Sequence, residues 1–203
     1  MNILALSPHT DDAELGAGAS LARFVGEGHM VVVAAFGTGD DNGASNAEHA
    51  AAMETLGVAD WHLFDQFPAR YYPDHRQEIL DCLEVLRDEV QPDLVFCPSL
   101  HDTHQDHATV AMEAVRVFKC CASILAYEAV RNHVSEPFQP THFVRLEERH
   151  IQAKMGALAC YVSQTRRAHW PAMMDSIQNQ AQVHGMRIQA QYAEAFEGVR
   201  WVI

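Results

Sequence analysis

The chain has 203 residues, of which 48% are hydrophobic and 20% are charged. This length suits one domain with a sizeable core, so we expect a single domain over residues 1–203. The 27 Asp and Glu outnumber the 14 Lys and Arg, and the net charge of -13 repels nucleic-acid backbones and anionic lipid. We therefore expect no nucleic acid and no membrane among the partners.

The sequence also indicates a cellular location. It contains no run of about 18 apolar residues, the length that a membrane-spanning helix needs, and its short apolar N-terminal run lacks the basic flank of a signal peptide. We therefore expect a cytoplasmic protein. The five cysteines are an odd, scattered set without a CxxC pair, which predicts free core thiols. The oligomeric state is left open, and a homo-oligomer is one alternative.

Strand-like and helix-like patterns alternate along the first hundred residues. An apolar run at residues 2–6 predicts a strand, and apolar residues then recur at helical spacing from Leu15 to Val25, before Gly26. The valine-rich run at residues 30–36 suits a strand buried on both faces. Further helices are expected at 47–56 and 79–90, further strands at 61–64 and 94–97, and an irregular surface loop at 65–74.

The second half continues this alternation with a strand at 123–130, helices at 147–160 and 171–184, and a late strand at 196–203. Parallel strands need crossover connections, which are normally helical and right-handed. The sequence therefore predicts an α/β protein: a three-layer, Rossmann-like fold with a mainly parallel sheet flanked by helices. In the common strand order 3-2-1-4-5, the first and fourth strands are neighbours.

Two polar loops follow these first and fourth strands. Residues 7–14 read Ser-Pro-His-Thr-Asp-Asp-Ala-Glu, and residues 98–107 read Pro-Ser-Leu-His-Asp-Thr-His-Gln-Asp-His. Both loops lie at carboxyl ends of strands, so we expect them to face each other. Their four histidines and five carboxylates suit a divalent metal with nitrogen and oxygen ligands; either loop alone is better explained by ordinary solvated polarity, and the pairing of the two favours the metal.

The residue types in these loops favour a catalytic metal site. Neither loop contains a cysteine, whereas structural zinc sites commonly use them, so an open site with a position left for water is expected. A competing motif is Glu14-Leu15-Gly16-Ala17-Gly18, which superficially resembles the glycine-rich motif of nucleotide-fold methyltransferases. It stands too far beyond its strand and lacks a third glycine, so close packing of a helix on the sheet explains these glycines better.

The two loops resemble the signatures of the PIG-L/LmbE family of metal-dependent de-N-acetylases, an AHPDDE-like loop after the first strand and a distal HPDH-like loop. Here they are residues 8–14 and 104–107, and weaker similarity extends along most of the chain, including 56–58, 154–164 and 192–196. The resemblance implies an LmbE-like fold and a zinc cofactor, with ferrous iron as the alternative. It implies three metal ligands: His9, Asp12 and His107.

The same resemblance assigns the proton-transfer groups. Asp11 would be the general base for the water that the metal activates, and His104, as an imidazolium, would be the partner acid. Asp106 would hold the His104 ring and favour its charged form. Two family prolines are replaced by Thr10 and Gln105, which removes backbone stiffness but no ligand.

The function implied is zinc-dependent removal of the N-acetyl group from an N-acetylglucosamine-type amino sugar, in a glycoconjugate or a nucleotide-linked precursor. An arginine that binds substrate in relatives is absent near Ser45 and Asn46, so the substrate of any one relative cannot be assigned to this chain. Two alternatives remain: an amidase for another acyl amide, and a non-catalytic module that binds metal or sugar. Asp11 and His104 argue against the second, because binding alone needs neither base nor acid.

Other residues are placed around this site or outside it. His101 and Asp102 are expected to shape the rim, and Asp40, Asp41 and Asn42 to form turns rather than a calcium loop. Arg166 and Arg167 are more consistent with solvated charges than with an anion grip. Arg70, Tyr71, Tyr72 and His75 are equally consistent with sugar contact and with a loop without function. Eight scattered histidines are left outside the site: His29, His49, His62, His133, His142, His150, His169 and His184.

Overall fold

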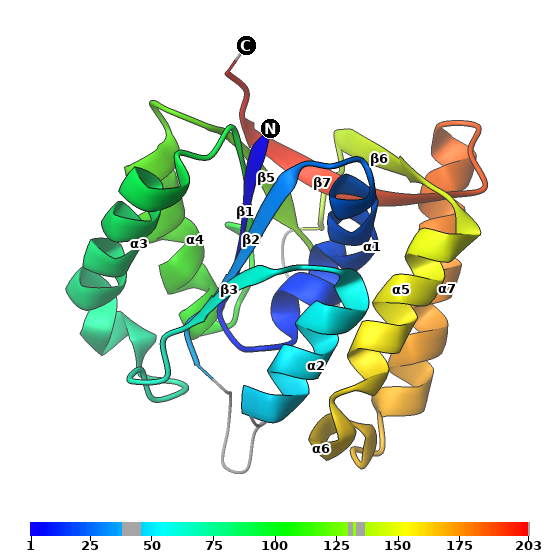
Figure 1. The fold of residues 1–203 in the computed structure, drawn as a ribbon, viewed down its shortest axis with the longest axis horizontal. Coiled ribbons are helices and arrows are strands. Elements are labelled where there is room, and N and C mark those ends of the chain that lie inside the picture. The colour runs from blue at the N-terminus through cyan, green and yellow to red at the C-terminus, as the bar shows by residue number, and fades with distance from the viewer. Residues whose placement is uncertain (38–45, 130–131, 133–136, 203) are drawn as a thin grey trace.

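The computed structural model describes residues 1–37, 46–129, 132 and 137–202. Its centre is a seven-stranded sheet with the order β3-β2-β1-β4-β5-β7-β6 (Figure 1). The strands are β1 (Asn2–Ser7), β2 (Met30–Ala35), β3 (Asp60–Leu63), β4 (Leu94–Pro98), β5 (Ser123–Tyr127), β6 (His142–Leu146) and β7 (Tyr192–Arg200). The first five strands are parallel and follow the expected order 3-2-1-4-5, so β1 and β4 are neighbours.

Helices cover both faces of the sheet, which confirms the three-layer α/β fold. They are α1 (Asp12–Gly26), α2 (Asn46–Leu56), the 3-10 helix η1 (Tyr72–His75), α3 (Arg76–Val90), α4 (Gln105–Phe118), α5 (Glu148–Ala159), α6 (Val162–Thr165) and α7 (Trp170–Arg187). Helices α3 and α4 lie on one side of the sheet, and α1, α2, α5 and α7 lie on the other (Figure 1). None of the described helices is long and apolar enough to cross a bilayer.

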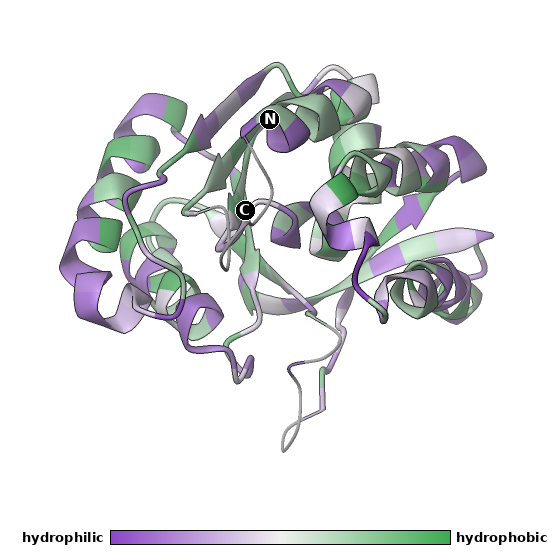
Figure 2. Ribbon diagram, turned by 90° about the horizontal axis from the view of Figure 1, so that it is seen from below, coloured by the Kyte–Doolittle hydropathy of each residue, from purple (hydrophilic) through white to green (hydrophobic). Residues whose placement is uncertain are grey.

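The alternation of side chains along each strand supplies both layers of the core. In β1, Ile3 and Ala5 pack with α1, α2 and α5, whereas Leu4 and Leu6 pack with α3 and α4. All four side chains are fully buried because both faces of the strand are covered. Figure 2 shows the result: apolar residues concentrate in the strands and on the inner helix surfaces, and hydrophilic residues lie on the outer surfaces.

The sheet differs from the sequence prediction at its C-terminal edge. β7 begins at Tyr192 rather than near residue 196 and runs antiparallel to β5, and β6, which we did not expect, pairs antiparallel with β7. β6 is an edge strand with mostly half-buried side chains, so it lacks a continuous apolar run. Helix α4 was also not expected, because its first turn lies in the polar loop at residues 98–107.

Small side chains and cysteines complete the fold. A Cβ atom at Gly16 would collide with the ring of Tyr127, which confirms that this glycine allows close packing of α1 on the sheet. The five cysteines are free, as expected; Cys97 is buried, and Cys82 and Cys160 are half-buried against the core, so the prediction of core thiols was wrong only for Cys120 and Cys121. Cys120 and Cys121 are exposed because they follow the end of α4.

Candidate active site

The loops after β1 and β4 meet at the carboxyl edge of the sheet. The loop after β1 is fixed by Ser7, whose hydroxyl accepts a hydrogen bond from the Ala13 backbone at 2.9 Å and donates to the His9 carbonyl. The His9 backbone N–H in turn donates to Asp12 Oδ2 at 2.8 Å. The first turn of α1 and the loop before it are therefore held as one unit.

Three side chains from these loops converge on one point. His9 Nδ1 lies 3.1 Å from Asp12 Oδ2, and His107 Nε2 lies 3.1 Å from the same oxygen. Zn²⁺ bonds of about 2.0 to 2.2 Å in a tetrahedron place neighbouring ligand atoms about 3.3 Å apart. The spacing of His9, Asp12 and His107 therefore fits a divalent metal, and these residues form one of two metal-compatible groups among the described residues.

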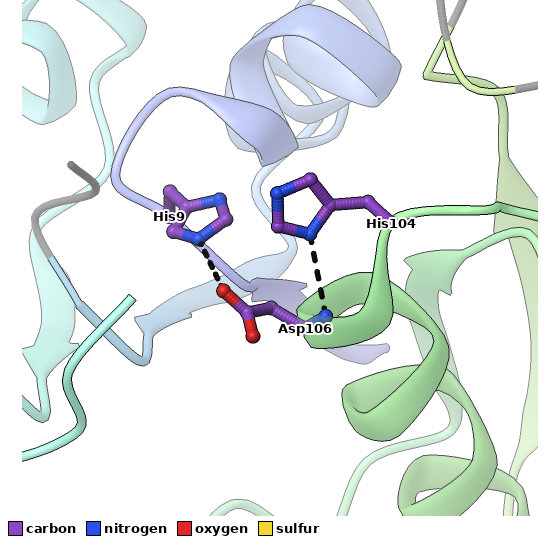
Figure 3. Close-up of side chains that lie close together, drawn as sticks. All are labelled: His9, His104 and Asp106. Atoms are coloured by element: carbon purple, nitrogen blue, oxygen red, sulfur yellow. Dashed lines mark hydrogen bonds and ion pairs between the residues drawn. The ribbon is translucent and has the colours of Figure 1, made fainter. Parts of the chain in front are cut away.

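Each imidazole of this group uses its other nitrogen to contact a second carboxylate. His9 Nε2 lies 3.1 Å from Asp106 Oδ2 (Figure 3), and His107 Nδ1 lies 2.7 Å from Asp102 Oδ2. Such outer carboxylates fix the tautomer and the orientation of a metal-binding histidine. The second metal-compatible group, His9, His104 and Asp106, uses this opposite side of the His9 ring.

The position of Asp106 corrects one expectation. Its carboxylate does not contact the His104 ring; it faces His9 and accepts hydrogen bonds from the backbone N–H groups of Arg70, at 2.6 Å, and Tyr72, at 3.3 Å. Arg70 adopts a φ of +73°, a conformation that non-glycine residues seldom take. Gln105 donates to the Arg70 carbonyl, so the residue that replaces a family proline ties the two loops together.

His104 is oriented by the backbone instead. It is the N-cap of α4, and its Nδ1 accepts the Asp106 backbone N–H at 3.3 Å (Figure 3). This contact requires an unprotonated Nδ1, which leaves the proton on Nε2. Partial burial and repulsion from His107 and His9 lower the pKa of His104; the charge of Asp106 favours the imidazolium form, as expected, but does not outweigh them.

The electrostatics of the group favour a bound cation. Burial disfavours the charged form of His9, but hydrogen bonds to Asp106 and Asp12 outweigh burial and raise its pKa to about 9. Burial likewise opposes the charge of His107, and the attraction of Asp12 and the hydrogen bond to Asp102 raise its pKa to about 10. Carboxylates that hold two protons on these rings would equally stabilise a divalent metal in their place.

Asp11 lies beside the metal-compatible group without joining it. It precedes α1, lines the same cavity and makes no side-chain capping bond to the helix. Burial and the neighbouring charge of Asp12 raise the pKa of Asp11. A carboxylate with a raised pKa is a better proton acceptor than an ordinary one, which suits a general base.

A buried polar cluster contacts the loop after β1 and the first turn of α1. The Tyr161 hydroxyl lies within hydrogen-bond distance of the Thr10 carbonyl and the Glu14 carboxyl, and His49 Nδ1 lies 3.1 Å from the same carbonyl. Burial raises the pKa of Glu14 to about 8 and lowers that of His49 to about 4. No local pattern in the sequence connects His49 or Tyr161 with the loop, because they lie on α2 and before α6, far along the chain.

A cavity of about 270 Å³ opens over the converging side chains. Five of the six predicted site residues line it, and Asp106 lies behind His9. His169, which we expected outside the site, lines the cavity, as do Gln164 and Arg167, whereas Arg166 does not. The lining does not include the residues of the loop before α3 that we considered for sugar contact: Arg70, Tyr71, Tyr72 and His75.

Two further predictions have different outcomes. Asp102, expected at the rim, is buried and accepts hydrogen bonds from the His104 backbone at 2.7 Å and from Asn132 at 3.2 Å in addition to its contact with His107. The signal for this role in the sequence was the pattern Asp102-x-His104, which comes shortly before His107. The predicted turn at Asp40, Asp41 and Asn42 lies outside the described residues.

Comparisons with known proteins agree with this geometry. The family model for GlcNAc-PI de-N-acetylase (PIG-L) matches residues 4–118, which span both loops. The uncharacterized deacetylase YaiS of Escherichia coli K12 is 27% identical over 164 residues, covering 77% of this chain and 88% of YaiS.

Solved structures share the fold. N,N'-diacetylchitobiose deacetylase from Pyrococcus horikoshii superimposes with a TM-score of 0.78 at 20% identity, covering 96% of this chain and 82% of that chain. GalB, the 4-carboxy-2-hydroxymuconate hydratase from Pseudomonas putida KT2440, has a TM-score of 0.76 at 18% identity, covering 100% and 98%. The fold thus serves more than one reaction, and the match that includes the loops carries the assignment. On that match, this chain belongs to the PIG-L family of de-N-acetylases.

Proposed function

We propose that this protein is a metal-dependent hydrolase that removes the N-acetyl group from an N-acetylglucosamine-type amino sugar, carried by a glycoconjugate or a nucleotide. The observation that carries the proposal is the convergence of His9, Asp12 and His107 beside Asp11 and His104 in one cavity. We assign the metal to these three ligands, with zinc first and ferrous iron as the alternative. A divalent metal bound there supplies a Lewis acid that polarises the amide carbonyl and lowers the pKa of water.

The protein's own groups then move the protons. Asp11 accepts a proton from water as the water oxygen forms a bond to the acetyl carbonyl carbon. His104 has its proton on Nε2, because Nδ1 accepts the Asp106 backbone N–H, and Nε2–H is the donor for the negative charge that develops on the carbonyl oxygen. When the C–N bond breaks, the leaving nitrogen takes the proton that Asp11 accepted from water and departs as the amine, while acetic acid forms and ionises to acetate.

His104 is placed to act as this hydrogen-bond donor. The His104 ring stands edge-on to His9 and 4.7 Å from the ring of His107, between centroids, which places it against the metal-compatible group. The Asp106 carboxylate orients His9, and the Asp106 backbone N–H orients the His104 ring. An amidase for a different acyl amide would use the same groups, so the acyl specificity has to be measured.

Metal content and acetate release test the proposal together. We expect about one equivalent of zinc or iron per chain in protein purified without metal-affinity resin, and much less in His9→Ala. Asp11→Ala should keep its metal and lose at least about 100-fold in acetate release from N-acetylated sugars, because general-base catalysis contributes about 10² to 10⁴.

The outcomes separate the alternatives. Metal bound at wild-type level in His9→Ala would reject the assigned ligands, and undiminished turnover in Asp11→Ala would remove Asp11 from the role of base. A metal-loaded protein that releases no acyl group from acetylated or longer N-acyl sugars would favour the non-catalytic binding module.

A further inference from the structure

One wall of the cavity beside the metal-compatible group is apolar. Trp170, Met173 and Ile177 of α7 all line it, and their spacing of three and four residues places them on one face of that helix. Leu15 of α1 lines the same cavity. The wall therefore consists of four large apolar side chains contributed by two helices.

A smaller hollow adjoins this cavity and is lined by polar as well as apolar side chains. It shares Leu15, Glu128 and Ile177 with the cavity, and its lining includes Lys154 and Glu194. Those two charges neutralise each other, because Lys154 Nζ lies 2.6 Å from Glu194 Oε1. This hollow thus offers paired charges rather than a free cation.

The charges around the cavity disfavour a phosphorylated ligand. Among the described lining residues, Arg167 is the one Lys or Arg; Asp12 offsets the charge of the proposed metal, and Asp11 and Glu128 contribute further carboxylates. Phosphate groups are usually held by several cationic or N–H donors, and nearby carboxylates repel them. A single exposed arginine is a weak counterpart for a diphosphate.

The acyl group of the substrate does not account for the wall. Trp170 and Ile177 are 5% and 6% exposed and present only their edges to the cavity, but they stand seven residues apart on α7, about 10 Å along its axis, which one acetyl methyl cannot cover. The matching apolar surface must then belong to the amine half of the substrate, on the group attached to the sugar.

We propose that the wall formed by Leu15, Trp170, Met173 and Ile177 binds an apolar aglycone, so that the substrate is a neutral N-acetylamino-sugar glycoside rather than a sugar phosphate or a nucleotide sugar. This inference rests on the proposed deacetylation. It specifies the substrate class further, through contacts of the wall with the aglycone, away from the amide that reacts.

A substrate series tests the wall directly on the wild-type, metal-loaded protein. The series consists of the methyl and hexyl glycosides of N-acetylglucosamine, N-acetylglucosamine 1-phosphate, and methyl N-hexanoylglucosaminide, with release of the free amine as the readout. Burial of one methylene is worth up to about fourfold in affinity, so kcat/KM should rise at least about tenfold from methyl to hexyl glycoside. The 1-phosphate and the N-hexanoyl compound should show no such gain.

Matched variants on α7 locate the effect. Met173 is half-buried and lines the cavity, so Met173→Glu should reduce the ratio of hexyl to methyl kcat/KM to within about threefold of unity. Met186 lies on the same helix but is 78% exposed, so Met186→Glu should leave the ratio as in wild type. Met173→Ser, which adds no charge, provides the same comparison if the glutamate prevents folding.

The results distinguish this inference from the proposed function. Equal kcat/KM for methyl and hexyl glycosides, a preference for the 1-phosphate, or a larger gain from the N-hexanoyl chain would overturn the aglycone assignment while leaving the hydrolase intact. Failure to release amine from every member of the series would overturn the proposed function itself.

Discussion

His9 and His107 each place one ring nitrogen toward Asp12 and the other toward a separate carboxylate. Asp106 serves His9 and Asp102 serves His107, so both rings are fixed in orientation before any ligand arrives. Pre-orientation of this kind lowers the cost of forming a metal site, because the imidazoles do not have to be ordered by the metal.

At this scale, Asp102→Asn is expected to weaken zinc binding about 10- to 100-fold, with little change in fold. Asp102 Oδ1 accepts the His104 backbone N–H and Oδ2 contacts His107, whereas an amide has one oxygen and cannot accept from both. A competition titration with a chromogenic chelator measures the affinity. The control is Asp74→Asn, an exposed residue of η1; equal affinity in the Asp102 and Asp74 variants would contradict the role of Asp102.

Among the elements, α1 depends on an ion pair that comes from two others. Glu194 of β7 accepts hydrogen bonds from the backbone N–H groups of Ala19, at 3.1 Å, and Ser20, at 2.7 Å. Lys154 of α5 donates to the Leu15 carbonyl at 2.7 Å. Leu15 and Ala19 are four residues apart, so their C=O and N–H groups are partners in the hydrogen-bond pattern of the helix. The ion pair therefore contacts the backbone of α1 near the middle of the helix.

Breaking this pair should be costly. Lys154 and Glu194 are 5% and 6% exposed at the side chain, and loss of one partner from a buried pair costs about 3 to 5 kcal/mol. We expect that Lys154→Met alone lowers the free energy of unfolding by about this amount. The double variant Lys154→Met/Glu194→Gln should regain part of the loss, because no unpaired charge remains. Urea unfolding of these two variants and of Glu194→Gln alone measures the coupling, and additive losses would show that the two residues do not interact.

A second prediction about these elements concerns the contact between α1 and the sheet. Gly16→Ala should destabilise the protein by about 1 to 3 kcal/mol, although alanine favours helices, because the new methyl group meets the buried Tyr127 ring. Gly26→Ala, at the end of the same helix, is the control, since a Cβ there meets nothing within 4 Å. Thermal unfolding compares the two; equal melting temperatures would mean that Tyr127 moves aside at no cost.

For the molecule as a whole, the pH dependence of stability sums over many titrating groups with opposite signs. Burial raises the pKa of Glu14 to about 8, so its contribution to stability falls as the pH rises from about 4.5 to 8. Burial lowers the pKa of His49 to about 4, so its contribution falls as the pH drops from about 6.5 to 4. The wild-type curve alone does not separate these effects.

A single variant isolates the contribution of His49. The unfolded chain protonates this histidine near pH 6.5 while the folded protein keeps it neutral, so wild type loses about 2 kcal/mol from His49 between pH 7 and pH 5. His49→Gln removes that loss, and its stability relative to wild type should improve by about the same amount over this interval. Urea unfolding at both values measures the difference; a constant gap would contradict a buried, neutral His49.

Local patterns in the sequence were sufficient for most of the fold. The valine-rich run of β2, the helical repeat from Leu15 and the glycine at position 26 predict their elements without reference to distant residues. Right-handed crossovers then leave few possible strand orders, and 3-2-1-4-5 brings the loops after β1 and β4 together. The members of the candidate site followed from the composition of these loops and their family resemblance.

The sequence by itself therefore determined the layered α/β core and the residues of the two loops, because periodicity, chirality and motif are properties of neighbouring residues. Only the tertiary structure decided the pairing within the site. The Asp106 carboxylate contacts His9, 97 residues away, and the Arg70 backbone, 36 residues away, and only its backbone N–H contacts the nearby His104 ring. The apolar wall from α7 and the antiparallel edge strands were likewise decided by tertiary structure. Contacts over such separations depend on how complete elements pack, and no local sequence period encodes them.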